Sequence, residues 1–312
     1  MELKKEMMGM NHSERSQVGL WPEGAVEMAG RWAQYAALIL LSLSVSSAEP
    51  AIKVMSFNIR YGAANDGDNS WPNRKELVAE TIQLFGPDLL GAQEVLDFQA
   101  EFLRDHLKGY GFHGVGREDG AAKGEFVPVL YRLDRFELVD SGHFWLSESP
   151  DVPGSKSWDT SLTRMCSWVI LRDKKGDGRP FGFANTHFDH RGPEARLESA
   201  KLIRERAMGI EENIPVIIVG DFNNGEEDAP YAALVRGDGG TSFVDSFRAI
   251  HGERSDLEGT MSRWNGNRKG RRIDWIIHSR KFVTLSAAIN HTNEDGRYPS
   301  DHYPVQAIIR RR

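Results

Sequence analysis

The chain has 312 residues, of which 40% are hydrophobic and 27% charged; this ordinary globular composition excludes a wholly disordered chain, a collagen-like chain and a multi-pass membrane protein. The 39 Lys and Arg residues against 45 Asp and Glu residues give a formal net charge of −6, which argues against DNA binding by bulk positive charge. Cys166 is the one cysteine in the sequence, so no intrachain disulfide and no cysteine-rich zinc site can form.

The N-terminal part of the chain carries an apolar run over residues 33–45, which follows Arg31 and ends in the small residues 46–48. This pattern is typical of a secretory signal peptide, and the run is shorter than the roughly 20 residues that span a bilayer. We therefore expect residues 1–48 to be removed on export to the periplasm or the medium, leaving residues 49–312; an N-terminal anchor or a buried helix is the alternative. Because residues 1–27 are long and polar for a signal peptide, we hypothesise that translation starts at Met28.

Short apolar runs that indicate strands alternate with helical patterns along the rest of the chain. Predicted strands cover residues 52–57, 89–92, 126–131, 136–146, 166–171, 181–186, 216–219, 273–277, 282–289 and 305–309, and predicted helices cover 73–85, 98–107 and 193–212. We expect two hairpins, one joining 126–131 to 136–146 and one joining 166–171 to 181–186. The sequence shows no internal repeat and no low-complexity linker after residue 48, so we expect one α/β domain with mixed sheets and helices outside them.

Polar side chains stand where these predicted strands end. Such groups converge on one rim when the strands share a sheet, and rims of this kind commonly hold active sites. Each residue alone has an ordinary explanation as a turn residue, a cap or a structural histidine. Their joint arrangement predicts an active site built from Asn58, Glu94, His187, Asp221, Asn223, Asp274, Asp301 and His302.

Six segments carry a resemblance to a known family. FNIRYG, QE, TH, GDFN, IDW and SDHYPV occur in this order between positions 57 and 305 and resemble the motifs of the endonuclease/exonuclease/phosphatase superfamily. That superfamily includes pancreatic-type deoxyribonucleases, abasic-site endonucleases, neutral sphingomyelinases, inositol polyphosphate 5-phosphatases and deadenylases. The resemblance implies a single-domain four-layer α/β/β/α sandwich, with two mixed sheets flanked by helices, and hydrolysis of phosphoric esters with the help of a divalent metal.

Hydrolysis of a phosphoric ester needs charge neutralisation, an activated water and help for the departing oxygen. The resemblance implies a Mg²⁺ site formed by Asn58, Glu94 and Asp301, whose oxygen atoms suit Mg²⁺ and also admit Mn²⁺. It implies that Asp221 activates the attacking water and that Asn223 orients this water or a phosphate oxygen.

The two histidines would donate to phosphoryl oxygens, each oriented by a carboxylate. The resemblance implies the pairs Asp274–His302 and Glu125–His187, the second by analogy with the deoxyribonuclease branch. His187 and Arg60 depart from the abasic-site branch, which has a tyrosine and an acidic residue at these places.

Basic residues offer further contacts to the substrate. Residues 263–272 contain five Lys and Arg residues in ten and form either a phosphate-gripping loop or a solvated mobile loop. The candidate substrate contacts are Arg132, Arg164, Arg268 and Arg271.

These observations together predict an exported metal-dependent phosphodiesterase acting on nucleic acid or on a small phosphodiester such as a phospholipid. We expect a monomer without a membrane span once the signal peptide is removed. The alternatives are a sugar-phosphate or inositol-type phosphomonoesterase and a non-catalytic binding module on the same fold. The binding module would have lost catalytic positions, and the sequence keeps all of them. A serine hydrolase lacks support because no G-x-S-x-G segment is present.

Overall fold

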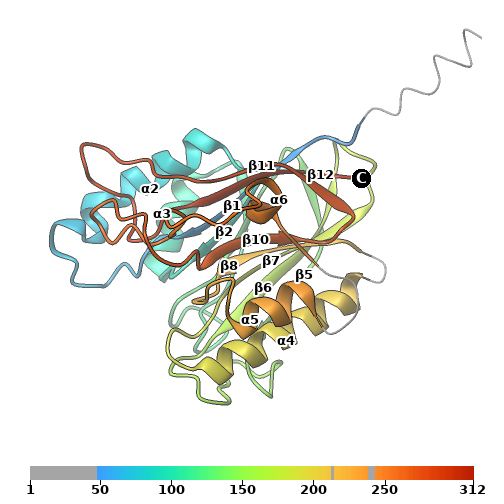
Figure 1. The fold of residues 1–312 in the computed structure, drawn as a ribbon, viewed down its shortest axis with the longest axis horizontal. Helices are drawn as coiled ribbons and strands as arrows, with labels where there is room; N and C mark the ends of the chain where they lie inside the picture. The colour runs from blue at the N-terminus through green and yellow to red at the C-terminus, as the bar shows by residue number, and fades with distance from the viewer. Residues whose placement is uncertain (1–47, 212–213, 238–242) are drawn as a thin grey trace, which may run out of the picture. The chain divides into compact units, whose positions relative to one another are not determined.

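Two six-stranded sheets lie face to face, with helices on their outer faces (Figure 1). The computed structural model describes residues 48–211, 214–237 and 243–312, so the predicted signal peptide lies outside the described residues except for Ala48. The strand order of the first sheet is β11 (Phe282–Ile289), β12 (Val305–Arg311), β1 (Ile52–Asn58), β2 (Leu89–Gln93), β4 (Val129–Arg132) and β3 (Tyr110–His113). That of the second sheet is β5 (Phe136–Trp145), β6 (Met165–Asp173), β7 (Pro180–His187), β8 (Val216–Asp221), β10 (Asp274–His278) and β9 (Val244–Asp245).

All helices except α6 lie on the two outer faces in the described part of the chain. The first sheet carries α2 (Trp71–Phe85) and α3 (Asp97–His106), preceded by the short 3₁₀ helix η1 (Gly67–Asn69). The second sheet carries α4 (Pro193–Glu211), α5 (Ala229–Tyr231) and the π-helical turn η2 (Ala232–Arg236), while α6 (Ser246–Ile250) contributes Phe247 to the core between the sheets. No helix in the described ranges is long and apolar enough to cross a membrane.

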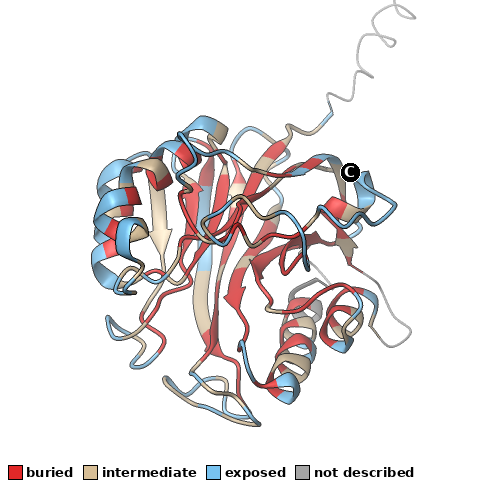
Figure 2. Cartoon of the chain, turned by 60° about the vertical axis from the view of Figure 1, so that its left-hand side comes forward, coloured by how far each residue is buried: buried red, intermediate tan, exposed pale blue. Residues whose placement is uncertain are grey.

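The four layers follow from the two-residue repeat of the strands. Successive side chains of a strand point to opposite faces, so Val54 of β1 packs between the sheets while Met55 packs against α2 and α3. In the same way, Val219 of β8 packs in the core between the sheets, while its neighbour Ile218 packs against α4. The inner strands are consequently buried along most of their length (Figure 2). The predicted four-layer sandwich is confirmed.

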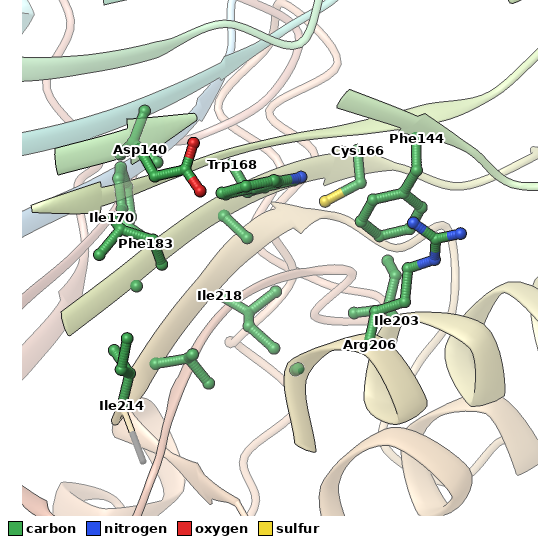
Figure 3. Close-up of a pocket in the computed structure, with 15 residues that line it drawn as sticks. Asp140, Phe144, Cys166, Trp168, Ile170, Phe183, Ile203, Arg206, Ile214 and Ile218 are labelled. Atoms are coloured by element: carbon green, nitrogen blue, oxygen red, sulfur yellow. The ribbon is translucent and has the colours of Figure 1, made fainter. Parts of the chain in front are cut away.

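An apolar cavity of about 480 Å³ lies between α4 and the outer face of β6, β7 and β8 (Figure 3). Trp168, Ile203 and Ile218 form part of its wall, and Asp140 and Arg206 are its charged residues. The lining includes none of the predicted active-site residues.

Strand register brings the polar strand ends together. In the first sheet, β1 and β2 are parallel with Asn58 opposite Gln93, which puts Glu94 one residue beyond. In the second sheet, β7 and β8 are parallel with His187 opposite Asp221, and the antiparallel strand β10 places Asp274 opposite Asp221 on the other side.

The predicted hairpin of residues 126–131 with 136–146 is wrong. Strand β4 pairs with β2 and β3 in the first sheet, whereas β5 pairs with β6 in the second, so the chain changes sheets between them. Strand β4 also begins later than predicted, at Val129, directly after Pro128, which has no N–H to donate to a ladder. The second predicted hairpin is confirmed as the antiparallel pair β6 and β7. Strand β3 was missed because its four residues are all half-buried and show no alternation.

The connection between the sheets contains a buried arginine, Arg135, with 5% exposure. Its guanidinium donates to Asp173 Oδ2 at 2.8 and 3.1 Å, to Asp88 Oδ2 at 2.7 Å and to the carbonyl oxygen of Ala51 at 2.8 Å. Arg135 therefore ties the beginnings of β1 and β2 to the end of β6.

We expect Arg135→Ala to lower the free energy of unfolding by about 3–5 kcal/mol, because it leaves two largely buried carboxylates without a partner. Guanidinium unfolding curves followed by tryptophan fluorescence measure the effect. The matched control is Arg132→Ala, which removes an arginine paired with Asp134 at an exposed position and should change stability little. Equal effects of the two substitutions would show that the sheets do not depend on this contact.

Candidate active site

Asn58 connects the two sheets at the site. Its Nδ2 donates to Glu94 Oε1 at 2.9 Å, on the side of the first sheet, and to Asp221 Oδ2 at 3.0 Å, in the second. Its Oδ1 accepts a hydrogen bond from the backbone N–H of Arg60 at 2.9 Å. The nitrogen of this amide therefore faces the carboxylates, whereas the sequence predicted its oxygen as a metal ligand.

Glu94 and Asp301 provide the carboxylates on the first-sheet side. Glu94 lies in the left-handed region at φ 61°, and its Oε2 accepts from the backbone N–H of Tyr61 at 2.7 Å. Burial raises the pKa of Glu94, but the hydrogen bond from Asn58 and the charge of His302 outweigh this effect and lower the pKa overall. Burial raises the pKa of Asp301, and the nearby charge of Glu94 adds to the increase, although His302 opposes it.

A divalent cation fits this set of donors. Ligand atoms of Glu94, His187 and Asp221 lie within 4.8 Å of one another. Of the three predicted metal ligands, Asn58, Glu94 and Asp301, this group contains Glu94 alone. Carboxylates that repel one another in a partly buried site are stabilised by a cation, and hard divalent ions prefer such oxygen donors. The site thus suits a divalent metal, while the choice of Mg²⁺ and the ligand role of Asp301 stay predictions.

Asp221, the last residue of β8, lies between the two histidines. Its Oδ2 is 3.4 Å from His187 Nε2 and 3.8 Å from His302 Nε2. Burial and the charge of Asp274 raise the pKa of Asp221 to about 7, against the opposing charge of His302. A carboxylate with such a pKa can accept a proton near neutral pH.

Asn223 follows on the same rim in a left-handed conformation, with φ 51°. Its backbone N–H donates to Asp221 Oδ1 at 3.0 Å, and its Nδ2 donates to the carbonyl oxygen of Phe188 and lies 3.1 Å from His187 Nε2. The amide is thereby held beside the carboxylate predicted to activate water.

The Asp274–His302 pair is present as a hydrogen bond. His302 Nδ1 donates to Asp274 Oδ2 at 3.0 Å, and both residues are buried. Burial lowers the pKa of His302, but the charges of Asp274 and Asp221 raise it well above the ordinary value, so this imidazole is cationic at neutral pH.

The predicted Glu125–His187 pair does not form a hydrogen bond. Glu125 Oε2 accepts from Arg117 Nη1 at 2.6 Å and lies 3.9 Å from His187 Nδ1, which has no hydrogen-bond partner within the described part of the chain. Burial and the charges of Arg164 and Arg117 lower the pKa of His187 well below the ordinary value, so this imidazole is neutral. Arg117 was missed because it lies in a glycine-rich segment outside every motif.

The four arginines predicted to contact the substrate lie in different parts of the structure. Arg164 is buried behind His187, with its Nη1 3.9 Å from Glu125 Oε2 and its Nη2 donating to His190 Nδ1 at 3.2 Å. Arg132 is not part of the site: β4 is antiparallel to β2, so Arg132 lies beside Asp88, where β2 begins, and Glu94 follows the opposite end.

The other two predicted arginines belong to residues 263–272. Arg271 is ion-paired with Glu227, at 2.7 Å, and with Asp228, and Arg268 is exposed. The backbone N–H of Arg263 donates to the carbonyl oxygen of Asp301 at 3.1 Å, so this segment packs against the loop that carries His302.

The comparisons with known proteins agree with this arrangement. Residues 55–302 match the model of the Endonuclease/Exonuclease/phosphatase family. The chain is similar to the structure of a mannosyl-6-phosphatase from Bacteroides thetaiotaomicron, with 36% identity, a TM-score of 0.75, and 83% of this chain and 99% of that chain covered. It is similar to an endonuclease/exonuclease/phosphatase family protein of the same organism at 35% identity and a TM-score of 0.77, over 84% of this chain and 98% of that one.

Among curated proteins, Nocturnin of Rattus norvegicus is 25% identical over 300 residues, which cover 85% of this chain and 65% of Nocturnin. The chain thus spans just under two thirds of that relative's length. The family model covers most of the chain, and its motifs meet at one polar site. The chain therefore belongs to the Endonuclease/Exonuclease/phosphatase family, whose members are metal-dependent hydrolases of phosphoric esters.

Proposed function

We propose that the protein is an exported, divalent-metal-dependent phosphatase that acts on small phosphomonoesters of the sugar-phosphate type. The observation that carries the hydrolytic role is the position of Asp221. Its Oδ2 lies within 4 Å of a neutral imidazole, a cationic imidazole and the amide of Asn58, which also binds Glu94. A water-activating carboxylate, phosphate donors and a metal carboxylate thus occupy one site.

Each residue has a distinct task in this proposal. The cation, when bound, neutralises phosphate charge. Asp221 takes the proton of the attacking water, which Asn223 orients from the same rim. The cationic His302, held by Asp274, donates to a phosphoryl oxygen whose negative charge grows in the transition state.

Two observations support a small monoester over the phosphodiester that the sequence favoured. Arg271 and Arg272 are paired with carboxylates, which leaves residues 263–272 with less free positive charge to hold a polyanionic backbone. The second is the similarity to a mannosyl-6-phosphatase over nearly the whole of that chain.

We also propose export through the predicted signal peptide. Amino-terminal sequencing of the protein recovered from the periplasm or medium of producing cells should start at Glu49. A protein retained in the cytoplasm with its N-terminal segment intact would contradict export without bearing on the catalytic proposal.

The mature protein should hydrolyse mannose 6-phosphate with a kcat/KM at least about 10-fold above that for bis(p-nitrophenyl) phosphate, equivalent to about 1.4 kcal/mol of transition-state stabilisation. Phosphate release and nitrophenol release are measured with Mg²⁺, with Mn²⁺ and with EDTA, which should abolish both reactions. A preference for the diester would restore the phosphodiesterase prediction and reject the monoester.

We expect Asp221→Asn to reduce kcat by about 10²–10⁴-fold, because the amide cannot accept the proton of the attacking water. The matched control is Asp134→Asn, the same change at an exposed carboxylate far from the site. Circular dichroism melting establishes that both variants are folded. A folded Asp221→Asn variant with undiminished turnover would remove Asp221 from this role.

A further inference from the structure

We propose that the guanidinium of Arg60 takes the place of a second cation beside Asp301, so that the site binds one divalent ion instead of two. The inference rests on the metal site of the proposed function and concerns how many ions that site accepts. Arg60 stands two residues after Asn58.

The backbone of Arg60 is fixed in an unusual conformation. Its φ of 64° lies in the left-handed region, which a residue with a side chain adopts at a cost. Its N–H donates to Asn58 Oδ1 at 2.9 Å, and its carbonyl oxygen accepts from Arg74 Nη2 at 3.1 Å and from Gln99 Nε2 at 3.0 Å. These contacts determine where the side chain leaves the backbone.

The guanidinium is then clamped by Asp66. Arg60 Nε donates to Asp66 Oδ2 and Arg60 Nη2 donates to Asp66 Oδ1, both at 2.9 Å. Since the guanidinium is a rigid plane, holding two of its nitrogens also fixes the third. That third nitrogen, Nη1, lies 3.5 Å from Asp301 Oδ2.

This geometry places a permanent positive charge against a carboxylate predicted to hold the metal. The side chain of Arg60 is 31% exposed and that of Asp301 is 14% exposed, so the pair is partly screened from water. The guanidinium of an arginine stays protonated at any physiological pH, so its positive charge is present whether or not a metal ion binds nearby. A second divalent ion at this carboxylate would meet both the bulk of the guanidinium and its charge.

Arg74 adds to the effect. It is buried, and its guanidinium donates to the carbonyl oxygens of Ile59, Asn69, Arg60 and Pro299. Burial lowers the pKa of Arg74 to about 10, and the negative charge of Asp301 opposes this decrease, so Asp301 also interacts with a second arginine. Asp66 accepts two hydrogen bonds from Arg60. Removing Arg60 would therefore leave both Asp66 and Asp301 without this arginine as a partner.

The test is the stoichiometry of Mn²⁺ binding to the full chain, measured by isothermal titration calorimetry and by electron paramagnetic resonance of free Mn²⁺, without substrate. We expect one ion for the unmodified protein and two for Arg60→Ala. Arg60→Gln removes the charge but keeps a donor for Asp66, and should also bind two ions. Arg60→Lys keeps the charge and should bind one.

The matched control is Arg132→Ala. Arg132 is clamped by Asp134 through the same two nitrogens, at 3.0 and 2.8 Å, but at the other end of the first sheet. This variant should bind one ion. Glu94→Gln, which alters the metal carboxylate itself, should lose binding.

The outcomes separate this inference from the proposed function. One ion in the folded Arg60→Ala and Arg60→Gln variants would overturn the inference, and a raised KM in them would then assign Arg60 to the substrate. Two ions in the unmodified protein would also overturn it but leave the hydrolase intact. No ion in any variant would reject both the inference and the metal-dependent function.

Discussion

The structure depends on buried amides that cross from one sheet to the other. Asn185 of β7 donates to the carbonyl oxygens of Ala92 and Pro128 at 2.7 and 2.8 Å and accepts from Gln93 Nε2 at 2.7 Å. A Cβ on Gly91 would lie 2.7 Å from Asn185 Cγ, so glycine permits this approach. Because leaving a buried amide unpaired costs about 1–3 kcal/mol, these bonds fix one sheet against the other. The hydrogen bonds from Asn58 to Glu94 and to Asp221 also depend on this relative position of the two sheets, because Asp221 belongs to the second sheet.

The two histidines have opposite charge states because their neighbouring charged side chains differ. Asp274 supports His302 and stabilises its cationic form, whereas Arg164 and Arg117 lie behind His187 and favour its neutral form. Asp221 touches both imidazoles and has an elevated pKa through burial and the charge of Asp274. One carboxylate with a raised pKa thus lies beside one cationic and one neutral imidazole, an arrangement that suits the water-activating role proposed for Asp221.

Most strands and helices were predictable because each carries its own pattern. The apolar runs of β1, β2 and β8 and the opening of α4 at Pro193 depend on neighbouring residues in the chain. Pairing is different, since β4 and β5 are close in sequence but belong to different sheets. The contacts of Arg135 with Asp88 and Asp173, 47 and 38 residues away, hold this crossing, and no local pattern reports them.

The sequence alone determined the family, the four layers and the residue types of the site, because ordered motifs at strand ends record the chemistry that they perform. Tertiary structure decided which of these residues meet. Asp274 forms a hydrogen bond with His302, whereas Glu125 pairs with Arg117 instead of His187. Arg132 lies at the far end of the first sheet, and Arg60 lies beside Asp301. The physical reason is that hydrogen bonds and ion pairs depend on distances of a few ångströms between side chains, and sheet register and loop conformation set those distances.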